Sequence, residues 1–309
     1  MKKGLLAALI LVLVAAFAAS AIYLGAYFTD SAKSQKEDDA RANKVTEMIQ
    51  EYNESQTTQA SETTQTTEAI QPSSTTDPSF NPYGTPGVSG HEDEYFTPDV
   101  IAEPENVPQR PQLASGSDFL PWYQELHKEN SDMVGWLQIE NTKINYPVMQ
   151  TSVDNANYYL YRDFDKKESV RGCVYAREEC DVFEPSDNIT LFGHNMKDGS
   201  MFAGLGAYYQ KSAWENNPLI FFDTLTESHV YKIFAVFKTS GTDGVGFAYH
   251  LMADAENEQE FNEFVSTCKE LAFYDTGITP VYGDKLLCLS TCEYTIDNGR
   301  FVVAAVRIT

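Results

Sequence analysis

The most reactive group that the sequence offers is a cysteine thiol at the end of a predicted strand. The chain contains five cysteines, and Cys292 closes the apolar run that begins at Leu286. Side chains alternate along a strand, so Cys288 and Cys292 share one face while Leu287 and Leu289 share the other. A thiolate is a strong nucleophile. Cys292, at a strand end, is therefore the candidate for covalent chemistry.

The other cysteines have simpler interpretations. Cys268 lies on the apolar stripe of a predicted helix, which indicates a buried small side chain. Cys173 and Cys180 could pair or remain separate thiols, because spacing alone does not decide a disulfide. Cys288 and Cys292 form a C-x-x-x-C pair, but no second cysteine pair or H-x-x-x-H accompanies it. The sequence therefore predicts no metal site.

A thiol that acts as a nucleophile needs a partner that moves protons, and histidine is the usual one. His194 follows the strand-like run 189–192 and Gly193, and it opens a polar loop. A side chain at such a strand end is well placed to face a cleft, so His194 is the candidate. The remaining histidines lie in a spacer, on a helix or in polar loops: His91, His127, His229 and His250.

An acyl-transfer site also needs a group that stabilises the developing oxyanion. Arg300 opens the last predicted strand, eight residues after Cys292. The segment between them can turn as a hairpin, which would place both side chains at neighbouring strand ends. The alternative is an arginine that only caps its strand at the surface.

These residues would be positioned by a mainly β domain over residues 116–309. Short β-rich runs separated by turn residues favour a mainly antiparallel barrel or sandwich. Two helices are predicted, one over 118–129 and an amphipathic one over 256–273. The strand-like runs are 134–139, 144–149, 172–176, 189–192, 219–223, 230–238, 285–291 and 301–308.

The N-terminal segment predicts a membrane anchor over residues 1–29. Residues 4–28 contain no charged side chain, and 25 helical residues reach about 37 Å, more than the roughly 30 Å of a hydrocarbon core. Lys2 and Lys3 precede the segment, so the N-terminus is expected in the cytoplasm and the rest outside. The alternative is a cleaved signal peptide, because 16–18 and 19–21 resemble small-residue cleavage sites.

Residues 30–115 predict a disordered spacer. Residues 30–54 are charged and could form a short polar helix, while 55–79 hold 13 Ser or Thr in 25 positions. Such composition cannot bury enough apolar surface to offset the loss of conformational entropy. The net charge of −23 argues against a nucleic-acid binder, since an acidic chain repels phosphates.

At these candidate residues the chain resembles the sortases, the cysteine transpeptidases of Gram-positive cell envelopes. The run Leu289-Ser290-Thr291-Cys292 matches the family's Leu, variable, Thr, Cys signature, and Arg300 matches the arginine that opens the next strand. The run 191–195 matches the histidine motif. The longer run 193–202, the run 146–150 and the long helix before the cysteine strand resemble class B. The family usually has Thr where this chain has Cys288.

The resemblance implies an eight-stranded β-barrel and a reaction without a cofactor. Cys292 would attack a carbonyl in a C-terminal sorting motif of a secreted protein, and His194 would serve as acid and then base. Arg300 would hold the carbonyl or oxyanion, while Ser290 and Thr291 are expected to contact substrate or orient the site. An amine of peptidoglycan or of its lipid-linked precursor would accept the protein, at the outer side of the cell membrane.

Three alternatives remain open from the sequence. A secreted cysteine peptidase or amidase would use the same Cys and His but transfer the acyl group to water. A non-catalytic surface domain on a stalk would need neither residue. A pilus-building sortase would carry a lid, of which Asp77-Pro78-Ser79-Phe80 is only an imperfect copy.

Overall fold

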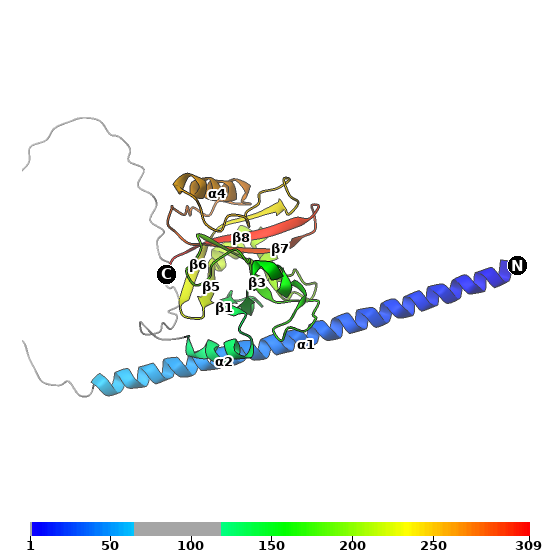
Figure 1. Ribbon diagram of the computed structural model, residues 1–309, viewed down its shortest axis with the longest axis horizontal. Helices are drawn as coiled ribbons and strands as arrows, with labels where there is room; N and C mark the ends of the chain where they lie inside the picture. Colours follow the sequence, from blue (N-terminus) through cyan, green and yellow to red (C-terminus); the bar gives the residue numbers. More distant parts are fainter. Residues whose placement is uncertain (1, 65–118) are drawn as a thin grey trace, which may run out of the picture.

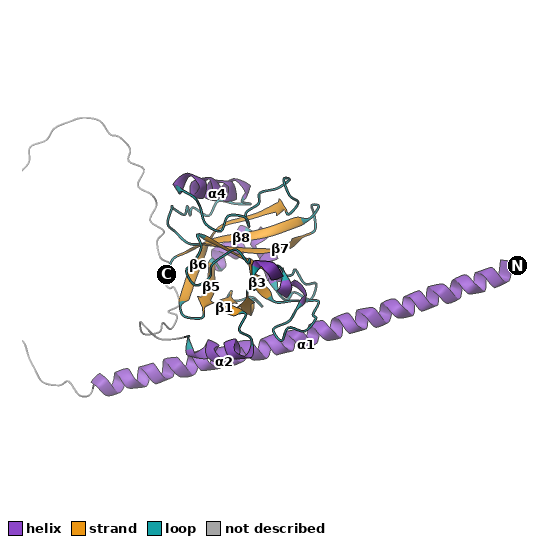
Figure 2. Ribbon diagram, in the orientation of Figure 1, coloured by secondary structure: helices purple, strands orange, loops and turns teal. Residues whose placement is uncertain are grey.

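Eight strands close into a single barrel, as predicted. The computed structural model describes residues 2–64 and 119–309, with side chains described for 10–55 and 119–309 (Figure 1). Around the barrel the order is β1-β2-β3-β4-β7-β8-β6-β5. Figure 2 shows the strands between helix α4 (Glu258–Leu271) on one side and helices α1 (Lys2–Thr64) and α2 (Pro121–Glu129) on the other. The strands are β1 Met133–Gln138, β2 Asn145–Met149, β3 Val174–Ala176, β4 Asn188–Phe192, β5 Leu219–Thr224, β6 Ser228–Ser240, β7 Leu286–Glu293 and β8 Gly299–Arg307.

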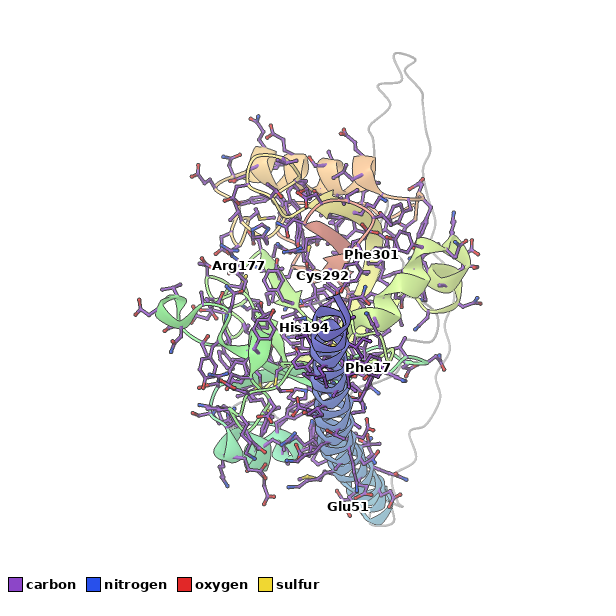
Figure 3. The ribbon with its side chains drawn as sticks, turned by 90° about the vertical axis from the view of Figure 1, so that its right-hand side faces the viewer. Phe17, Glu51, Arg177, His194, Cys292 and Phe301 are labelled. Carbon is purple, nitrogen blue, oxygen red and sulfur yellow. The ribbon has the colours of Figure 1, made fainter. Side chains whose placement is uncertain are left out.

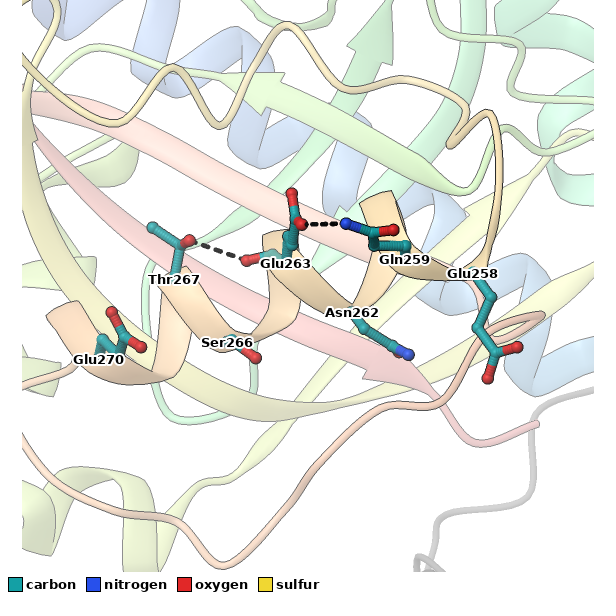
Figure 4. Close-up of a pocket in the computed structure, with 7 residues that line it drawn as sticks. All are labelled: Glu258, Gln259, Asn262, Glu263, Ser266, Thr267 and Glu270. Atoms are coloured by element: carbon teal, nitrogen blue, oxygen red, sulfur yellow. Dashed lines mark hydrogen bonds between the residues drawn. The ribbon is translucent and has the colours of Figure 1, made fainter.

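Alternation along the strands separates two apolar layers. Leu287, Leu289 and Val303 belong to the cluster that fills the barrel, whereas Leu286 and Cys288 point outward. Helix α4 (Glu258–Leu271) covers this outward layer with its apolar face. Its opposite face is polar, with Glu258, Gln259, Asn262, Glu263, Ser266, Thr267 and Glu270 along it (Figure 4).

The pairing of β4 with β7 is parallel, and it matters most for the site. Phe192 is the register partner of Ser290, so both strands end at the same rim of the barrel. Parallel neighbours require a long connection. Here the connection contains the 3-10 helix η3 (Phe202–Tyr209), α3 (Lys211–Asn216), β5, β6 and α4. Residues from the two ends of this long segment therefore meet in space.

The first helix, α1 (Lys2–Thr64), is much longer than the predicted anchor. Its N-terminal part extends beyond the barrel (Figure 1), and large apolar side chains such as Leu11, Phe17 and Phe28 are exposed there. Within the described chain this helix is long and apolar enough to cross a membrane, a property that signal sequences share.

The polar helix that the sequence allowed over residues 30–54 is present as part of α1, which continues to Thr64, so the expectation of disorder is wrong for residues 55–64. Helix α2 (Pro121–Glu129) and α1 pack together in one apolar cluster with parts of β1 and β2. The physical reason is a stripe at helical spacing that the charged composition concealed. Its members are Ala42, Val45, Met48, Ile49 and Tyr52. The rest of the predicted spacer, residues 65–115, lies outside the described residues, because the structure does not describe 65–118. His91 and the run Asp77–Phe80 belong to this part.

Candidate active site

Cys292 and Arg300 are brought together by the hairpin of β7 and β8. They are direct register partners in this antiparallel pair, as the sequence predicted. Arg300 donates from Nη1 to the carbonyl oxygen of Asn298 at 3.1 Å, to Asn298 Oδ1 at 3.0 Å and to the carbonyl oxygen of Gly299 at 3.0 Å. These bonds hold the guanidinium against the turn, beside the thiol.

His194 reaches the same rim through the parallel pair of β4 and β7. Phe192 faces Ser290 in the register, so His194 and Cys292 each lie two residues beyond that level. Gly193 makes the bend between strand and loop, where an added Cβ would come within 2.8 Å of the Phe202 ring. A larger residue would displace the loop that carries the histidine.

The loop after His194 is tied to the cysteine strand. Asn195 donates from Nδ2 to the carbonyl oxygen of Cys292 at 2.9 Å. The backbone N–H of Phe202 donates to the carbonyl oxygen of His194, also at 2.9 Å. The first bond ties the histidine loop to the cysteine strand, and the second closes the histidine loop on itself. The sequence motif contained Asn195 without indicating this role.

The imidazole itself is oriented by a backbone carbonyl. His194 Nε2 lies 2.8 Å from the carbonyl oxygen of Leu160, at the end of the 3-10 helix η2 (Tyr158–Tyr161). A carbonyl oxygen only accepts, so Nε2 carries the proton and Nδ1 remains for proton transfer. The Tyr161 ring lies beside the imidazole, with 5.5 Å between centroids. No sequence signal marks Leu160, because the group that acts is its main chain.

All three candidate residues line one cavity of about 150 Å³. Figure 3 shows Cys292 and His194 close together at the rim, with Arg177 nearby. A second cavity of about 320 Å³ shares Asn157, Phe192 and Arg300 with the first. It also has Arg177 and His250 in its wall, so His250, which was predicted to lie in an unrelated loop, borders the site.

Ser290 and Thr291 line the smaller cavity, but both are buried. The Ser290 hydroxyl forms a hydrogen bond with the hydroxyl of Tyr249. Burial raises the pKa of Tyr249 to about 12, so Tyr249 stays a neutral hydrogen-bonding group. Thr291 Oγ1 has no hydrogen-bond partner within the described part of the chain. Their roles toward substrate stay predictions.

Cys292 differs from the other four cysteines, all of which are buried free thiols. Burial raises the pKa of Cys180 to about 11 and raises the pKa of Cys173, Cys268 and Cys288 as well. Those four thiols are therefore poor nucleophiles at neutral pH. Cys292 is half-buried at the cavity.

Comparisons with known proteins agree with this geometry. Residues 137–308 match the model of the sortase domain. The chain belongs to the sortase family. Two relatives named Sortase B, from Staphylococcus aureus and Listeria monocytogenes, are 29% and 32% identical over 60% of this chain and 74% of theirs. A solved Staphylococcus aureus sortase B–substrate complex is 29% identical, with a TM-score of 0.56 over 62% of this chain and 86% of that one.

As a sortase, the protein is a cysteine transpeptidase of the sortase B-like kind, which sorts proteins to the cell wall. Family membership favours the enzyme over a non-catalytic surface domain. The sortase B relatives also favour class B over a pilus-building sortase.

Proposed function

We propose that this sortase is a membrane-anchored enzyme that cleaves a C-terminal sorting motif and transfers the protein, through a thioester, to an amine of peptidoglycan. The observation that supports the proposal is that Cys292, His194 and Arg300 line one cavity at the ends of adjacent strands. A similar solved structure contains a substrate, which is consistent with a cleft of this kind taking a peptide.

In the first half-reaction the Cys292 thiol passes its proton to His194 Nδ1 as Sγ attacks the carbonyl carbon of the motif. A bond forms between sulfur and carbon, and Arg300 stabilises the charge on the oxygen. The carbon–nitrogen bond then breaks, and His194 gives the proton on Nδ1 to the leaving amine. The product is a thioester between Cys292 and the secreted protein.

In the second half-reaction an amine attacks the thioester carbon. His194 Nδ1 takes the proton of that amine, a new amide bond forms and the carbon–sulfur bond breaks. The proton then passes from Nδ1 to Sγ, which restores the Cys292 thiol. The hydrogen bond from Nε2 to Leu160 is kept throughout, because Nε2 bears its proton in both charge states of the ring.

Residues 1–29 would hold the enzyme in the cell membrane, with the N-terminus in the cytoplasm and the catalytic domain of residues 116–309 facing the cell wall. Lys2 and Lys3 precede the apolar segment, and α1 runs on from it to the body. Cargo proteins with sorting motifs and peptidoglycan, or its lipid-linked precursor, would be the two substrates.

The test is product analysis with the full chain in detergent micelles. A library of sorting-motif peptides is incubated with and without triglycine as the amine, and the products are identified by mass spectrometry. We expect a triglycine adduct whose fraction rises with the amine concentration. If only hydrolysis products form at every amine concentration, the enzyme is a peptidase and not a transferase.

A further inference from the structure

The part of α1 just after the apolar segment contacts both loops that flank His194. On one side, Ser31 donates to Asp198 at 2.9 Å, in the loop that follows His194. On the other side, the helix contacts the 162–172 loop, which follows the helix η2 that ends beside Leu160. Ser34 lies 3.3 Å from Ser169, each through its hydroxyl.

The centre of this contact is Arg171, whose side chain has 0% exposure. Its Nη2 donates to Gln35 at 2.8 Å, and its Nη1 lies 3.3 Å from Asp38 Oδ2. A fully buried guanidinium requires a partner for its charge. Among the described residues, the helix supplies both side chains that hydrogen-bond or ion-pair with this guanidinium. The loop conformation seen in the structure therefore depends on the helix.

Gly172, the residue after Arg171, packs directly against the carbonyl group of Leu160, which orients His194. An added Cβ at Gly172 would come within 2.4 Å of the carbonyl oxygens of both Leu160 and Tyr159. The N–H of Cys173 also donates to the Tyr159 carbonyl at 3.0 Å. A short path of direct contacts thus joins Asp38, Arg171, the backbone of Gly172, the Leu160 carbonyl and the His194 imidazole.

Tyr146 of β2 lies between the histidine loop and the helix. Its hydroxyl accepts from the N–H of Met201 at 3.1 Å, at the end of the loop that begins with His194. The Gln35 side chain of α1 lies close enough to this hydroxyl to lower its pKa, against the larger effect of burial, which raises it. The helix thus contacts the histidine loop through Ser31 and through Tyr146.

We propose that residues 31–41 of α1 are a positioning element of the active site, which fixes the imidazole of His194 by holding both flanking loops. Asp38 and Ser31 act through other residues and do not contact the substrate. The inference rests on the proposed role of His194 in proton transfer. It makes the catalytic rate depend on a helix that continues directly from the membrane anchor.

The experiment compares Asp38→Asn with Glu47→Gln in the full chain in micelles, at about pH 7.5. Burial raises the pKa of Asp38 to about 6, so the carboxylate is charged under these conditions. Glu47 is an exposed carboxylate on the same helix, outside residues 31–41. Both variants therefore lose one charge, but only Asp38→Asn leaves Arg171 unpaired.

For Asp38→Asn we expect kcat to fall about tenfold with little change in KM, because displacement of a catalytic group by about 1 Å can cost up to 100-fold in rate. Glu47→Gln and Lys44→Ala, which breaks the exposed pair with Glu125 on α2, should keep the wild-type kcat. NMR should show the Nε2–H proton of His194 in the wild type and in Glu47→Gln, and its loss through exchange in Asp38→Asn.

Ser31→Ala keeps the proposal testable if Asp38→Asn does not fold. It removes only the bond to Asp198, and we expect a kcat about threefold lower at an unchanged melting temperature. Wild-type kcat in folded Asp38→Asn or in Ser31→Ala would overturn the proposal, as would an equal loss in Lys44→Ala. Retained turnover in His194→Ala would instead contradict the proposed function.

Discussion

The two ends of the outward face of β7 carry chemically identical side chains in different surroundings. Cys288 lies beneath α4 among Phe264, Val265 and Cys268, and it has 0% exposure. Cys292, four residues later on the same face, is half-buried beside the cavity. This difference shows that the cover of helix α4, and not the residue type or the strand, decides which thiol is available to a substrate.

The largest expected difference between Cys292 and Cys288 appears when each thiol is removed in turn. We expect Cys292→Ala to lower the turnover of a sorting peptide by at least about 1000-fold, because no other thiol reaches the cavity. Cys288→Ala is the matched control and should keep most of the activity. Turnover is measured by peptide cleavage, and circular dichroism confirms the fold. Appreciable turnover by Cys292→Ala would mean that the nucleophile is another residue.

Arg300 extends the comparison to the neighbouring strand. Arg300→Lys keeps the charge but loses the planar fork, so we expect kcat to fall about 100-fold. Arg307→Lys, at the far end of β8, is the matched control and should have wild-type kcat. Equal rates for the two variants would show that Arg300 only caps its strand.

Thiol labelling compares the reactivity of Cys292 with that of the other cysteines without any mutation. With iodoacetamide at pH 8 we expect Cys292 to react at least about ten times faster than the other four cysteines, since burial excludes the reagent and raises their pKa. Raising the pH from 8 to 9 should increase the labelling rate of Cys180 about tenfold, because its pKa of about 11 lies well above both values and the small thiolate fraction grows tenfold with each pH unit. Peptide mapping by mass spectrometry measures each rate, and comparable labelling of Cys288 would contradict the assignment.

The smallest expected effect is on stability. Here substitution of Cys288 should cost more than substitution of Cys292, the reverse of their effects on turnover. Cys288→Ser places a hydroxyl in the apolar layer under α4, so we expect the free energy of unfolding to fall by about 1–3 kcal/mol. Cys292→Ser is at the open end and should cost less than about 0.5 kcal/mol. Urea denaturation followed by circular dichroism measures both. Equal losses would show that α4 does not distinguish the two sites.

The β-rich runs between turn residues predicted a barrel or a sandwich, and the resemblance to the sortases selected the eight-stranded barrel that the structure has. The pair of Cys292 and Arg300 followed from the hairpin, and His194 from a motif. The Leu160 carbonyl could not be predicted, since a main-chain group has no residue signature and lies 34 positions from His194.

The docked part of α1 was missed for a different reason. Asp38 and Arg41 have the composition of a solvated charged helix, yet Asp38 pairs with a guanidinium that is completely buried. Composition does not distinguish a solvated carboxylate from a buried, paired one. Only the tertiary contact with Arg171 decides between them.

The position of β7 and β8 in the chain has a consequence for folding. They follow the other six strands of the barrel along the chain, and β7 must enter between β4 and β8 before the barrel can close. Until then the edge of β4 is unpaired and His194 has no cysteine beside it. Because such long-range pairing forms slowly, catalytic competence is among the last properties that the nascent chain acquires. An incomplete or stalled chain therefore carries no working nucleophile.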